Sequence, residues 1–378
     1  MFAETITEPE IRLNTIEEAI EDIKSGKILI VVDDEDRENE GDFICAAEKI
    51  TPELVNFMAK HGRGLICTPI LEQRAKELDL DLMVKSNTAM HNTAFTVSID
   101  LIGQGCTTGI SAYDRATGIK AIINPDTKPT DFARPGHIFP LIAKQGGVLR
   151  RTGHTEAAVD LARLADCYPA GVLVEILNED GSMARLPQLI EISRQLSIKI
   201  ISIKDLVAYR MRTERLVSLE METEIDTTYG KFAVKAFRQL TTGDVHLAFT
   251  MGEISNGEPT LVRVHSNTET GDILGILFDG YAEQLSRSLQ IIAKAKKGVL
   301  LFMRHHEGDT SILDKLKALD NNPKNNPPAS DEQRDFGTGA QILRELGITK
   351  IKLISNHTKK RIGLIGYGLE ISEHVYLD

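Results

Sequence analysis

The residues best suited to chemistry lie in one acidic segment near the start of the chain. Residues 33–42 read Asp-Asp-Glu-Asp-Arg-Glu-Asn-Glu-Gly-Asp, which places seven carboxylates and one arginine in ten residues. Carboxylates at this density repel one another unless a cation is bound, and their oxygens suit a hard ion such as Mg²⁺. Arg37 could hold a phosphate or a sugar oxygen. The alternative is a solvated surface turn, but a position directly after a buried strand favours a functional loop.

A second segment, residues 146–156, combines glycines, two arginines and a histidine at the start of a predicted helix. A helix N-terminus favours an anion because its backbone N–H groups and dipole are positive. The residues delivered there are Arg151, Thr152, Gly153, His154 and Thr155. The arginines could bind phosphate, and His154 could ligate a metal or move a proton. The other interpretation is that Thr155 only caps the helix and His154 has no role.

Three further segments carry candidate residues. In Arg134-Pro-Gly-His137 a histidine follows a proline–glycine turn, where the backbone can approach a ligand. Glu175 lies inside an apolar strand, where a carboxylate needs a partner or a shifted pKa, although a structural salt bridge would satisfy it equally well. Residues 107–111, Thr-Thr-Gly-Ile-Ser, place hydroxyl groups, including that of Thr108, beside a glycine.

Alternating helices and strands must position these residues. Thr15 and Glu18 form a capping-box pattern that predicts a helix ending at Gly26. Residues 28–32 are a continuous apolar run, which indicates a buried strand. The remaining predictions in this half are a helix over 52–62, a strand over 171–177, a helix from about 187, a strand over 198–203 and a short helix ending near 209.

A charged stretch at 210–215 separates two styles of sequence, so the predicted boundary lies near residue 210, with domains at 1–210 and 211–378. The second half is expected to contain strands at 231–238, 244–251, 260–265, 298–303 and 350–355 and helices at 281–296 and 338–346. Residues 320–330, rich in proline and asparagine, predict no regular structure. The expected fold class is α/β, in the mixed α+β sense, for both domains.

Composition limits the function classes. The 378 residues carry a formal net charge of -11, which argues against a general nucleic-acid binder but not against a local phosphate pocket. No stretch of 18 apolar residues predicts a membrane span, and the first residues do not resemble a signal peptide. The four cysteines, Cys45, Cys67, Cys106 and Cys167, have no CxxC spacing, so reduced thiols in a cytoplasmic protein are expected.

Taken together, these segments resemble 3,4-dihydroxy-2-butanone 4-phosphate synthase. The resemblance covers nearly all of residues 15–209, in order. The matching stretches are DDEDRENEGD (33–42), HGRGLIC (61–67), TTGISAYDR (107–115), RPGHIFPL (134–141), GGVLRRTGHTEA (146–157) and PAGVLVEILNEDGSMAR (169–185). It implies a magnesium-dependent lyase of riboflavin biosynthesis that converts ribulose 5-phosphate to 3,4-dihydroxy-2-butanone 4-phosphate and formate.

The resemblance also implies residue roles. Glu38 and His154 would ligate Mg²⁺ or Mn²⁺, and His137 and Glu175 would form the essential acid–base pair. The substrate would be held by Arg37, Glu38, Asp42, Glu175 and the loop Arg151, Thr152, Gly153, His154 and Thr155, with Cys67 and Thr108 lining the pocket. A homodimer with sites at the subunit interface is implied. Neither nucleic acid nor membrane is expected as a partner.

Residues 213–378 resemble GTP cyclohydrolase II, through LVRVHSNTETGDILG (261–275), AEQL (282–285), RDFGTGAQILRELGITKIKLISN (334–356) and GLIGYGLEI (363–371). Arg334, Gln284 and Lys360 follow the family pattern, with Glu332 in place of an aspartate. The family binds zinc through three cysteines. Here those places hold Thr268, Phe278 and Tyr281 or their neighbours, and a phosphate-binding segment has become Glu307-Gly-Asp-Thr310.

Without zinc there is no activated water to open the guanine ring, so no zinc is expected and cyclohydrolase II activity is predicted to be absent. The second half would then be a scaffold, a nucleotide-binding regulatory module or a relic. Two alternatives stay open: a bifunctional enzyme with non-standard zinc ligands such as His265, His305 and His306, and a non-enzymatic metal- or nucleotide-binding regulator.

Overall fold

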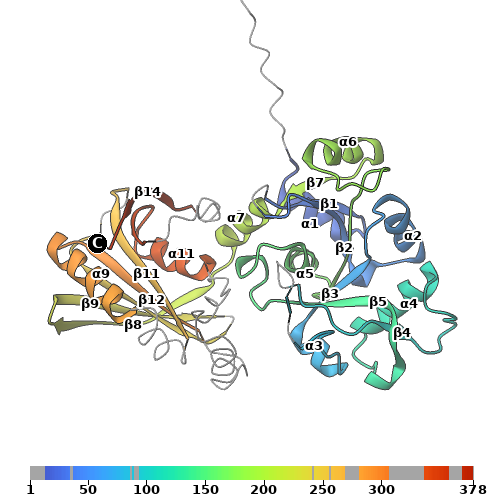
Figure 1. Cartoon of the computed structure of the whole chain (residues 1–378), viewed down its shortest axis with the longest axis horizontal. Helices are drawn as coiled ribbons and strands as arrows, with labels where there is room; N and C mark the ends of the chain where they lie inside the picture. Colours follow the sequence, from blue (N-terminus) through green and yellow to red (C-terminus); the bar gives the residue numbers. More distant parts are fainter. Residues whose placement is uncertain are drawn as a thin grey trace, which may run out of the picture. The chain divides into compact units, whose positions relative to one another are not determined.

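The computed structural model describes residues 13–34, 37–85, 87–88, 93–240, 242–254, 257–268, 281–305, 336–356 and 368–377. The chain divides into two compact units, Met1–Tyr209 (unit 1) and Arg210–Asp378 (unit 2). Each is built on its own mixed sheet with helices (Figure 1), which confirms the predicted α/β class. Within the described part of the chain, no helix combines the length and the apolar character needed to cross a membrane.

The described residues of unit 1 form a seven-stranded sheet in the order β4-β5-β3-β6-β2-β1-β7. Its strands are β1 (Leu29–Val32), β2 (Gly41–Ala46), β3 (Cys67–Leu71), β4 (Ile99–Leu101), β5 (Phe132–Ala143), β6 (Gly171–Glu175) and β7 (Ile200–Ser202). The interior strand β2 runs antiparallel to both β1 and β6, whereas β3 pairs parallel with β5. This arrangement brings the ends of β2, β3 and β6 to one region, where the polar side chains described below gather.

Helices cover both faces of this sheet (Figure 1). They are α1 (Ile16–Lys24), α2 (Pro52–His61), α3 (Glu72–Glu77), α4 (Ala112–Ile123), α5 (His154–Leu164), α6 (Leu186–Leu196) and α7 (Ile203–Thr213). The capping box of Thr15 and Glu18 begins α1 as predicted. Helix α5 packs against β2, β3 and β6, whereas α2 and α4 pack against each other on the other side.

Side chains alternate along β2, so one face of this strand contributes to the apolar core and the other face contributes to the polar region described below. Phe43 and Cys45 point into an apolar core that includes Val55 and Met58 of α2. Because successive side chains of a strand face opposite sides, Asp42 and Ile44 face the side covered by α5. The buried Asp42 therefore belongs to the α5 face of the sheet.

The described residues of unit 2 form a seven-stranded sheet in the order β14-β13-β11-β12-β10-β9-β8. Its elements are β8 (Val217–Thr227), β9 (Gly230–Gln239), β10 (Val245–Met251), β11 (Thr260–Thr268), β12 (Gly298–His305), β13 (Lys350–Ile354) and β14 (Glu370–Val375), with α9 (Tyr281–Ala295) and α11 (Phe336–Glu345). The pairs from β8 through β10 to β12 are antiparallel, and those joining β12, β11, β13 and β14 are parallel.

Two strands of unit 2 had no counterpart among the predictions. Strand β8 alternates glutamates with apolar residues, and Leu219 and Met221 on it are exposed, so the usual signal of a buried apolar run is missing. Strand β14 is also largely exposed, so its sequence likewise lacks the apolar run that indicates a buried strand. The predicted irregular segment 320–330 lies outside the described residues.

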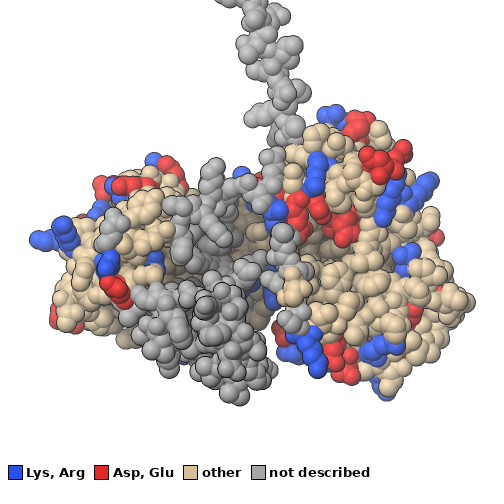
Figure 2. Space-filling view, in the orientation of Figure 1, with Lys and Arg blue, Asp and Glu red and all other residues tan. Residues whose placement is uncertain are grey.

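On the face drawn in Figure 2, acidic and basic side chains of the described residues lie side by side on each unit. No large surface of one sign appears among those residues on that face. This pattern agrees with the net charge of -11 in giving no broad basic surface there.

Candidate functional site

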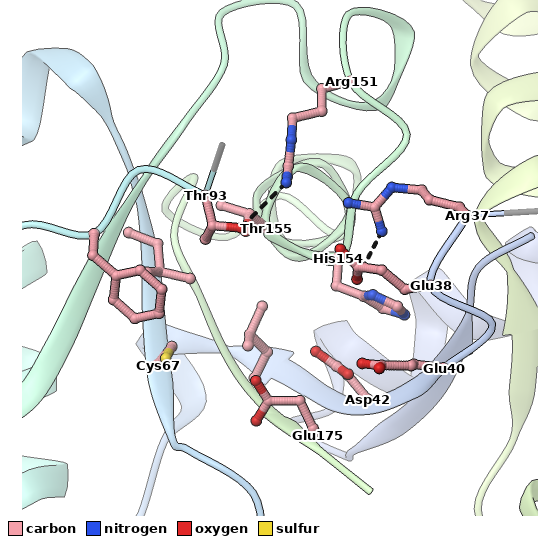
Figure 3. Close-up of a pocket in the computed structure, with 13 residues that line it drawn as sticks. Arg37, Glu38, Glu40, Asp42, Cys67, Thr93, Arg151, His154, Thr155 and Glu175 are labelled. Atoms are coloured by element: carbon pink, nitrogen blue, oxygen red, sulfur yellow. Dashed lines mark hydrogen bonds and ion pairs between the residues drawn. The ribbon is translucent and has the colours of Figure 1, made fainter. Parts of the chain in front are cut away.

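A polar cavity of about 460 Å³ opens at the α5 side of the unit 1 sheet. It is lined by Arg37, Glu38, Glu40, Asp42, Cys67, Thr93, Phe95, Leu141, Arg151, His154, Thr155, Leu173 and Glu175. In Figure 3, Glu40, Asp42 and Glu175 lie along one side of the cavity, and Arg37 and Arg151 lie on the opposite side. The cavity therefore has Glu40, Asp42 and Glu175 on one side and, on the other, Arg151 and the Arg37–Glu38 ion pair, whose atoms lie 2.9 Å apart.

The acidic loop after β1 is folded around the carboxylate of Asp33, whose side chain is only 1% exposed. One oxygen accepts from the Arg37 guanidinium at 2.9 Å and the Glu38 backbone N–H at 3.2 Å. The other accepts from the Glu40 N–H at 2.8 Å. A buried carboxylate with three donors holds the backbone of residues 37–40, from which Glu38 and Glu40 project into the cavity.

A second cation holds this loop from outside. Arg185, just before α6, donates to the Glu38 carbonyl at 2.8 Å and also to the Asn39 carbonyl. Asn39 has a left-handed backbone with φ 55°. These contacts reverse the chain between β1 and β2 and leave the carboxylate side chains on the cavity side (Figure 3).

One group of side chains fits a divalent cation. Asp33, Glu38 and His154 each bring one possible ligand atom within 4.8 Å of the other two. The Nε2 atom of His154 lies 3.0 Å from the Val31 carbonyl. Because a carbonyl only accepts, Nε2 must carry the proton, which leaves Nδ1 as the ligand atom. Burial lowers the pKa of His154, which favours the neutral imidazole that metals bind.

Asp42 and Glu175 face each other across the β2–β6 pair. Asp42 is 3% exposed, and its Oδ1 has no hydrogen-bond partner among the described residues. Burial, followed by the charge of Glu175, raises the pKa of Asp42 well above its ordinary value of 3.8. An unsatisfied buried oxygen that lines a cavity is suited to a ligand hydroxyl.

Glu175 is fixed by the segment before β3. Its Oε2 accepts from the Leu65 N–H at 2.8 Å. Gly64 packs so closely that a Cβ there would lie 2.5 Å from the same oxygen. Cys67 lies beside the pair, buried, and burial raises the pKa of its thiol well above the ordinary range. At neutral pH Cys67 is therefore an uncharged wall of the cavity rather than a nucleophile.

The opposite side is built by the loop that enters α5. Arg151, 5% exposed, pairs with Glu156 at 2.8 Å, and Glu156 is 1% exposed. The other oxygen of Glu156 accepts from the Lys144 N–H at 3.0 Å, and Arg151 reaches Thr93 at 3.4 Å. One dashed line in Figure 3 marks the Arg151–Thr93 contact, and the other marks the Arg37–Glu38 ion pair. A buried, anchored guanidinium beside the start of α5 suits an anionic group.

Eight of the residues predicted from the sequence line this cavity: Arg37, Glu38, Asp42, Cys67, Arg151, His154, Thr155 and Glu175. Thr152 and Gly153 lie in the loop that leads to it but do not line it. His137 and Thr108 lie elsewhere and are exposed. His137 instead pairs with Asp100, its Nδ1 lying 2.7 Å from Oδ2.

Sequence reasoning missed several lining residues. One of them, Glu40, belongs to the acidic segment. So does Asp33, which does not line the cavity but holds the loop, and the charge density of the segment alone could not distinguish these two roles. The others are Thr93, Phe95, Leu141 and Leu173. Thr93 and Phe95 belong to a segment with no motif, and the two leucines have the ordinary appearance of core residues. Only the register of the sheet identifies them as cavity walls.

In unit 2, the structure describes the side chains of two residues singled out in the sequence, His265 and Gln284. His265 is buried and stacks on Phe302, with ring centroids 5.6 Å apart. Gln284 accepts from Arg263 at 3.4 Å. The predictions on Phe278, His306, 307–310, Glu332, Arg334 and Lys360 lie outside the described residues, as do the side chains of Thr268, Tyr281 and His305.

Comparison with known proteins gives the same two-part division. Residues 17–209 match the 3,4-dihydroxy-2-butanone 4-phosphate synthase family, and residues 218–376 match the GTP cyclohydrolase II family. The riboflavin biosynthesis protein RibBA of Cytophaga hutchinsonii is 56% identical over 377 residues, covering 98% of this chain and 93% of the relative. RibBA of Parabacteroides distasonis is 53% identical with the same coverage.

Solved structures agree. The crystal structure of RibBX, a two-domain 3,4-dihydroxy-2-butanone 4-phosphate synthase from A. baumannii, is 39% identical with a TM-score of 0.68 and covers 96% of this chain and 99% of that one. A structure of 3,4-dihydroxy-2-butanone 4-phosphate synthase in complex with two magnesium ions is 41% identical with a TM-score of 0.51. It covers 53% of this chain and 98% of its own.

These comparisons correct one prediction. The prediction that residues 211–378 lack cyclohydrolase II activity is contradicted, because residues 218–376 match that family and the similarity to the RibBA relatives covers 98% of the chain. The physical error was to treat missing thiolates as decisive, although imidazole and carboxylate groups also ligate zinc. The chain belongs to the 3,4-dihydroxy-2-butanone 4-phosphate synthase family, with a GTP cyclohydrolase II domain fused behind the synthase domain.

Proposed function

We propose that this protein converts ribulose 5-phosphate to 3,4-dihydroxy-2-butanone 4-phosphate and formate in riboflavin biosynthesis. Family membership and the names of the RibBA relatives support this activity. The observation that carries it is the cavity itself, in which Arg37 and Arg151 lie opposite Glu40, Asp42 and Glu175, and in which Glu38 and His154 of the Asp33–Glu38–His154 group are lining residues. A pentulose phosphate has the matching polarity, since its phosphate is anionic and its other end carries hydroxyl and carbonyl groups.

Glu38 and His154 would hold Mg²⁺, or Mn²⁺ in its place. Their oxygen and neutral nitrogen donors fit such an ion, and the related synthase that binds two magnesium ions supports the choice. A bound divalent ion would polarise the sugar carbonyl and stabilise negative charge on neighbouring oxygens. Asp33 would act on this site through the loop, since its oxygens already accept from Arg37, Glu38 and Glu40.

The substrate would lie across the cavity. Arg151 and Thr155, which line the cavity at the start of α5, would receive the phosphate, with Thr152 and Gly153 forming the loop between them, and Arg37 would contact an oxygen nearer the metal. Asp42 would meet a sugar hydroxyl through its unpartnered Oδ1. Cys67, uncharged and buried, would limit water at the reacting carbons.

Proton transfer would fall to Glu175 and His137. The reaction removes a proton next to a carbonyl, eliminates water, shifts a carbon–carbon bond and releases carbon 4 as formate. The atoms balance without any other reactant, because the water lost in elimination returns when formate is released. Positioned acid–base groups each contribute about 10²–10⁴-fold to such steps. Glu175 is held for this by the Leu65 N–H.

His137 and Thr108 are exposed and lie outside the cavity lining, so we propose that a second copy of the chain brings them to the cavity as a homodimer. Exposed large apolar side chains on the same unit support such a contact, because protein interfaces bury apolar surface. They are Leu82, Met83, Val84, Ile102, Ile110 and Tyr113.

The activity is tested by incubating the purified protein with ribulose 5-phosphate and Mg²⁺ and measuring formate. Glu38→Gln, His154→Ala and Glu175→Ala should each abolish formate release while leaving the melting temperature close to that of the parent. The exposed change Glu17→Gln on α1 serves as a matched control and should keep full activity. Turnover by the three variants would contradict the proposal, and so would inactivity of the parent protein.

A second candidate function, the opening of GTP with release of formate and pyrophosphate, is favoured by the cyclohydrolase II match of residues 218–376. It requires zinc ligands other than thiolate, since the chain has no cysteine after Cys167. Incubation with GTP and Zn²⁺, followed by measurement of bound zinc and pyrophosphate, tests it. Pyrophosphate release supports the second function, and its absence with zinc supplied contradicts it.

A further inference from the structure

We infer that Asp100 is a positioning residue for the reaction, which holds the His137 imidazole in one tautomer and leaves Nε2 as its proton-transfer atom. Asp100 lies on β4 and His137 on β5, on the exposed side of unit 1 away from the cavity lining. The inference rests on the proposed acid–base role of His137 and adds the group that orients it.

Two contacts join the residues. One carboxylate oxygen of Asp100 accepts from the His137 backbone N–H at 2.9 Å, and the other lies 2.7 Å from the ring Nδ1. The carboxylate thus holds both the backbone and the ring of the same residue. The Asp100 side chain is 16% exposed and that of His137 is 45% exposed, so the pair is buried on the aspartate side and open on the histidine side.

The contact fixes the tautomer. An ionised carboxylate offers only acceptors, so Nδ1 must donate and carry the proton. In a neutral ring Nε2 then has its lone pair available, and in a protonated ring it has a proton to give. A carboxylate that plays this part for a catalytic histidine sets orientation and tautomer without itself moving a proton.

The surrounding backbone is shaped to allow this pair. Residues 134–137 form an excursion from the β4–β5 ladder, since Ile99 pairs with Ile138 and Asp100 with Ala133. Gly136 lies so close to β4 that a Cβ would sit 2.1 Å from the Ile99 carbonyl carbon. The excursion is pinned there by the Ser98 hydroxyl, which accepts from the Gly136 N–H at 3.1 Å.

The other side of Asp100 is closed by the loop that carries Thr108. A Cβ on Gly109 would lie 2.1 Å from Asp100 Oδ2, and its φ of +89° favours glycine. Asp114 holds this loop by accepting from the Gly109 N–H and the Thr107 hydroxyl, both at 3.0 Å. Gly136 and Gly109 therefore pack too closely against this region to be replaced by a residue with a side chain. The loops that contain them are held by Ser98 and Asp114. The Asp100 carboxylate between these loops contacts the solvent-facing His137.

A purely structural role for Asp100 would need only the backbone contact to His137. Asp100→Asn separates the two roles, because the amide oxygen can still accept from the His137 N–H while its NH₂ donates to Nδ1. The expected result is an inverted tautomer with the proton on Nε2. We expect kcat for formate release to fall by about 10–100-fold, as for other groups that orient a reactive side chain, with KM changed by less than about twofold.

The tautomer is read by ¹⁵N NMR of the full-length protein labelled in histidine, under conditions in which imidazoles are neutral, with His137→Gln used to assign the signal. Asp126→Asn, an exposed carboxylate-to-amide change in the same unit, is the matched control and should leave tautomer and kcat unchanged. Thermal melts confirm that each variant is folded.

Protonated Nδ1 in the parent, inversion in Asp100→Asn and loss of kcat together support the inference. It is overturned if the ring in the parent protein carries its proton on Nε2, a result that does not depend on the Asp100 variant, or if Asp100→Asn leaves kcat unchanged. Failure of the proposed function is a separate result, because a parent protein that releases no formate from ribulose 5-phosphate can still show the tautomer set by Asp100.

Discussion

Subunit mixing tests how the site is assembled. Glu175 lines the cavity, whereas His137, with a side chain 45% exposed, does not. If a homodimer completes each site by bringing His137 from one subunit to Glu175 of the other, the two residues of one site belong to different chains. Glu175→Ala and His137→Ala should each reduce formate release by about 10²-fold or more when present in both subunits.

A heterodimer of the two variants should recover activity. The cavity of the His137→Ala subunit keeps its own Glu175 and receives an intact His137, whereas the other cavity lacks both groups. One site in two is complete, so heterodimers purified through two different affinity tags should reach about half of the parent activity. This exceeds the activity of either variant alone by about 50-fold or more, which a formate assay resolves easily.

A second pairing controls for nonspecific rescue. A heterodimer of Glu175→Ala with Glu38→Gln changes two residues that line the same cavity, so it places one defect in each site and should stay inactive. Recovery in this control, or no recovery in the Glu175→Ala and His137→Ala heterodimer, would refute assembly of the site from two subunits.

Four further outcomes are expected. Glu156→Ala should lower the free energy of unfolding by about 3–5 kcal/mol in denaturant melts, because it leaves the buried Arg151 without its anion; an unchanged midpoint would contradict this. Gly64→Ala should lower kcat, because a Cβ 2.5 Å from Glu175 Oε2 must displace that carboxylate, and parent-like kcat would show that the displacement is harmless. The raised pKa of Asp42 means that its contribution to stability is present below the ordinary value of 3.8 and is lost as pH rises through the folded value. In EDTA, Asp42→Asn should therefore raise the melting temperature increasingly as pH rises from the ordinary value of 3.8 through the folded value, by about 2–4 °C per kcal/mol, whereas a difference that does not change with pH would exclude the charge as the cause. Removal of divalent ions with EDTA should stop formate release and Mg²⁺ should restore it; activity that persists in EDTA would remove the metal from the reaction.

Only part of the fold of unit 1 was predicted, where its signals are local, and strands β2, β3, β4 and β5 had no counterpart among the predictions. The capping box at Thr15 begins α1, and the apolar run before Asp33 forms β1, as the pattern indicates. The limits of prediction lie where burial does not follow composition. Strand β8 exposes Leu219 and Met221 among glutamates, so it lacks the apolar run of a buried strand.

The site was predictable to the extent that its residues occur in dense motifs. Arg37, Glu38 and His154 stand in segments whose composition already indicates ion and phosphate binding. Residues that act only through contacts made in the folded chain could not be found in this way. Asp100, for example, contacts His137 because the register between β4 and β5 is irregular. Asp33 likewise holds its loop through three hydrogen bonds that form only in the folded chain. Its neighbours in sequence carry the same charge, so the sequence alone does not single it out.

The central claim is that the cavity of unit 1 binds a pentulose phosphate and that carbon 4 of this substrate is released as formate. Its most direct test is ¹³C NMR of ribulose 5-phosphate labelled at carbon 4, incubated with the protein and Mg²⁺. The account predicts that the label leaves as formate in equal amount to a four-carbon phosphate product, and that Glu38→Gln stops the reaction. Label retained in a sugar phosphate, or formate formed equally by Glu38→Gln, would contradict it.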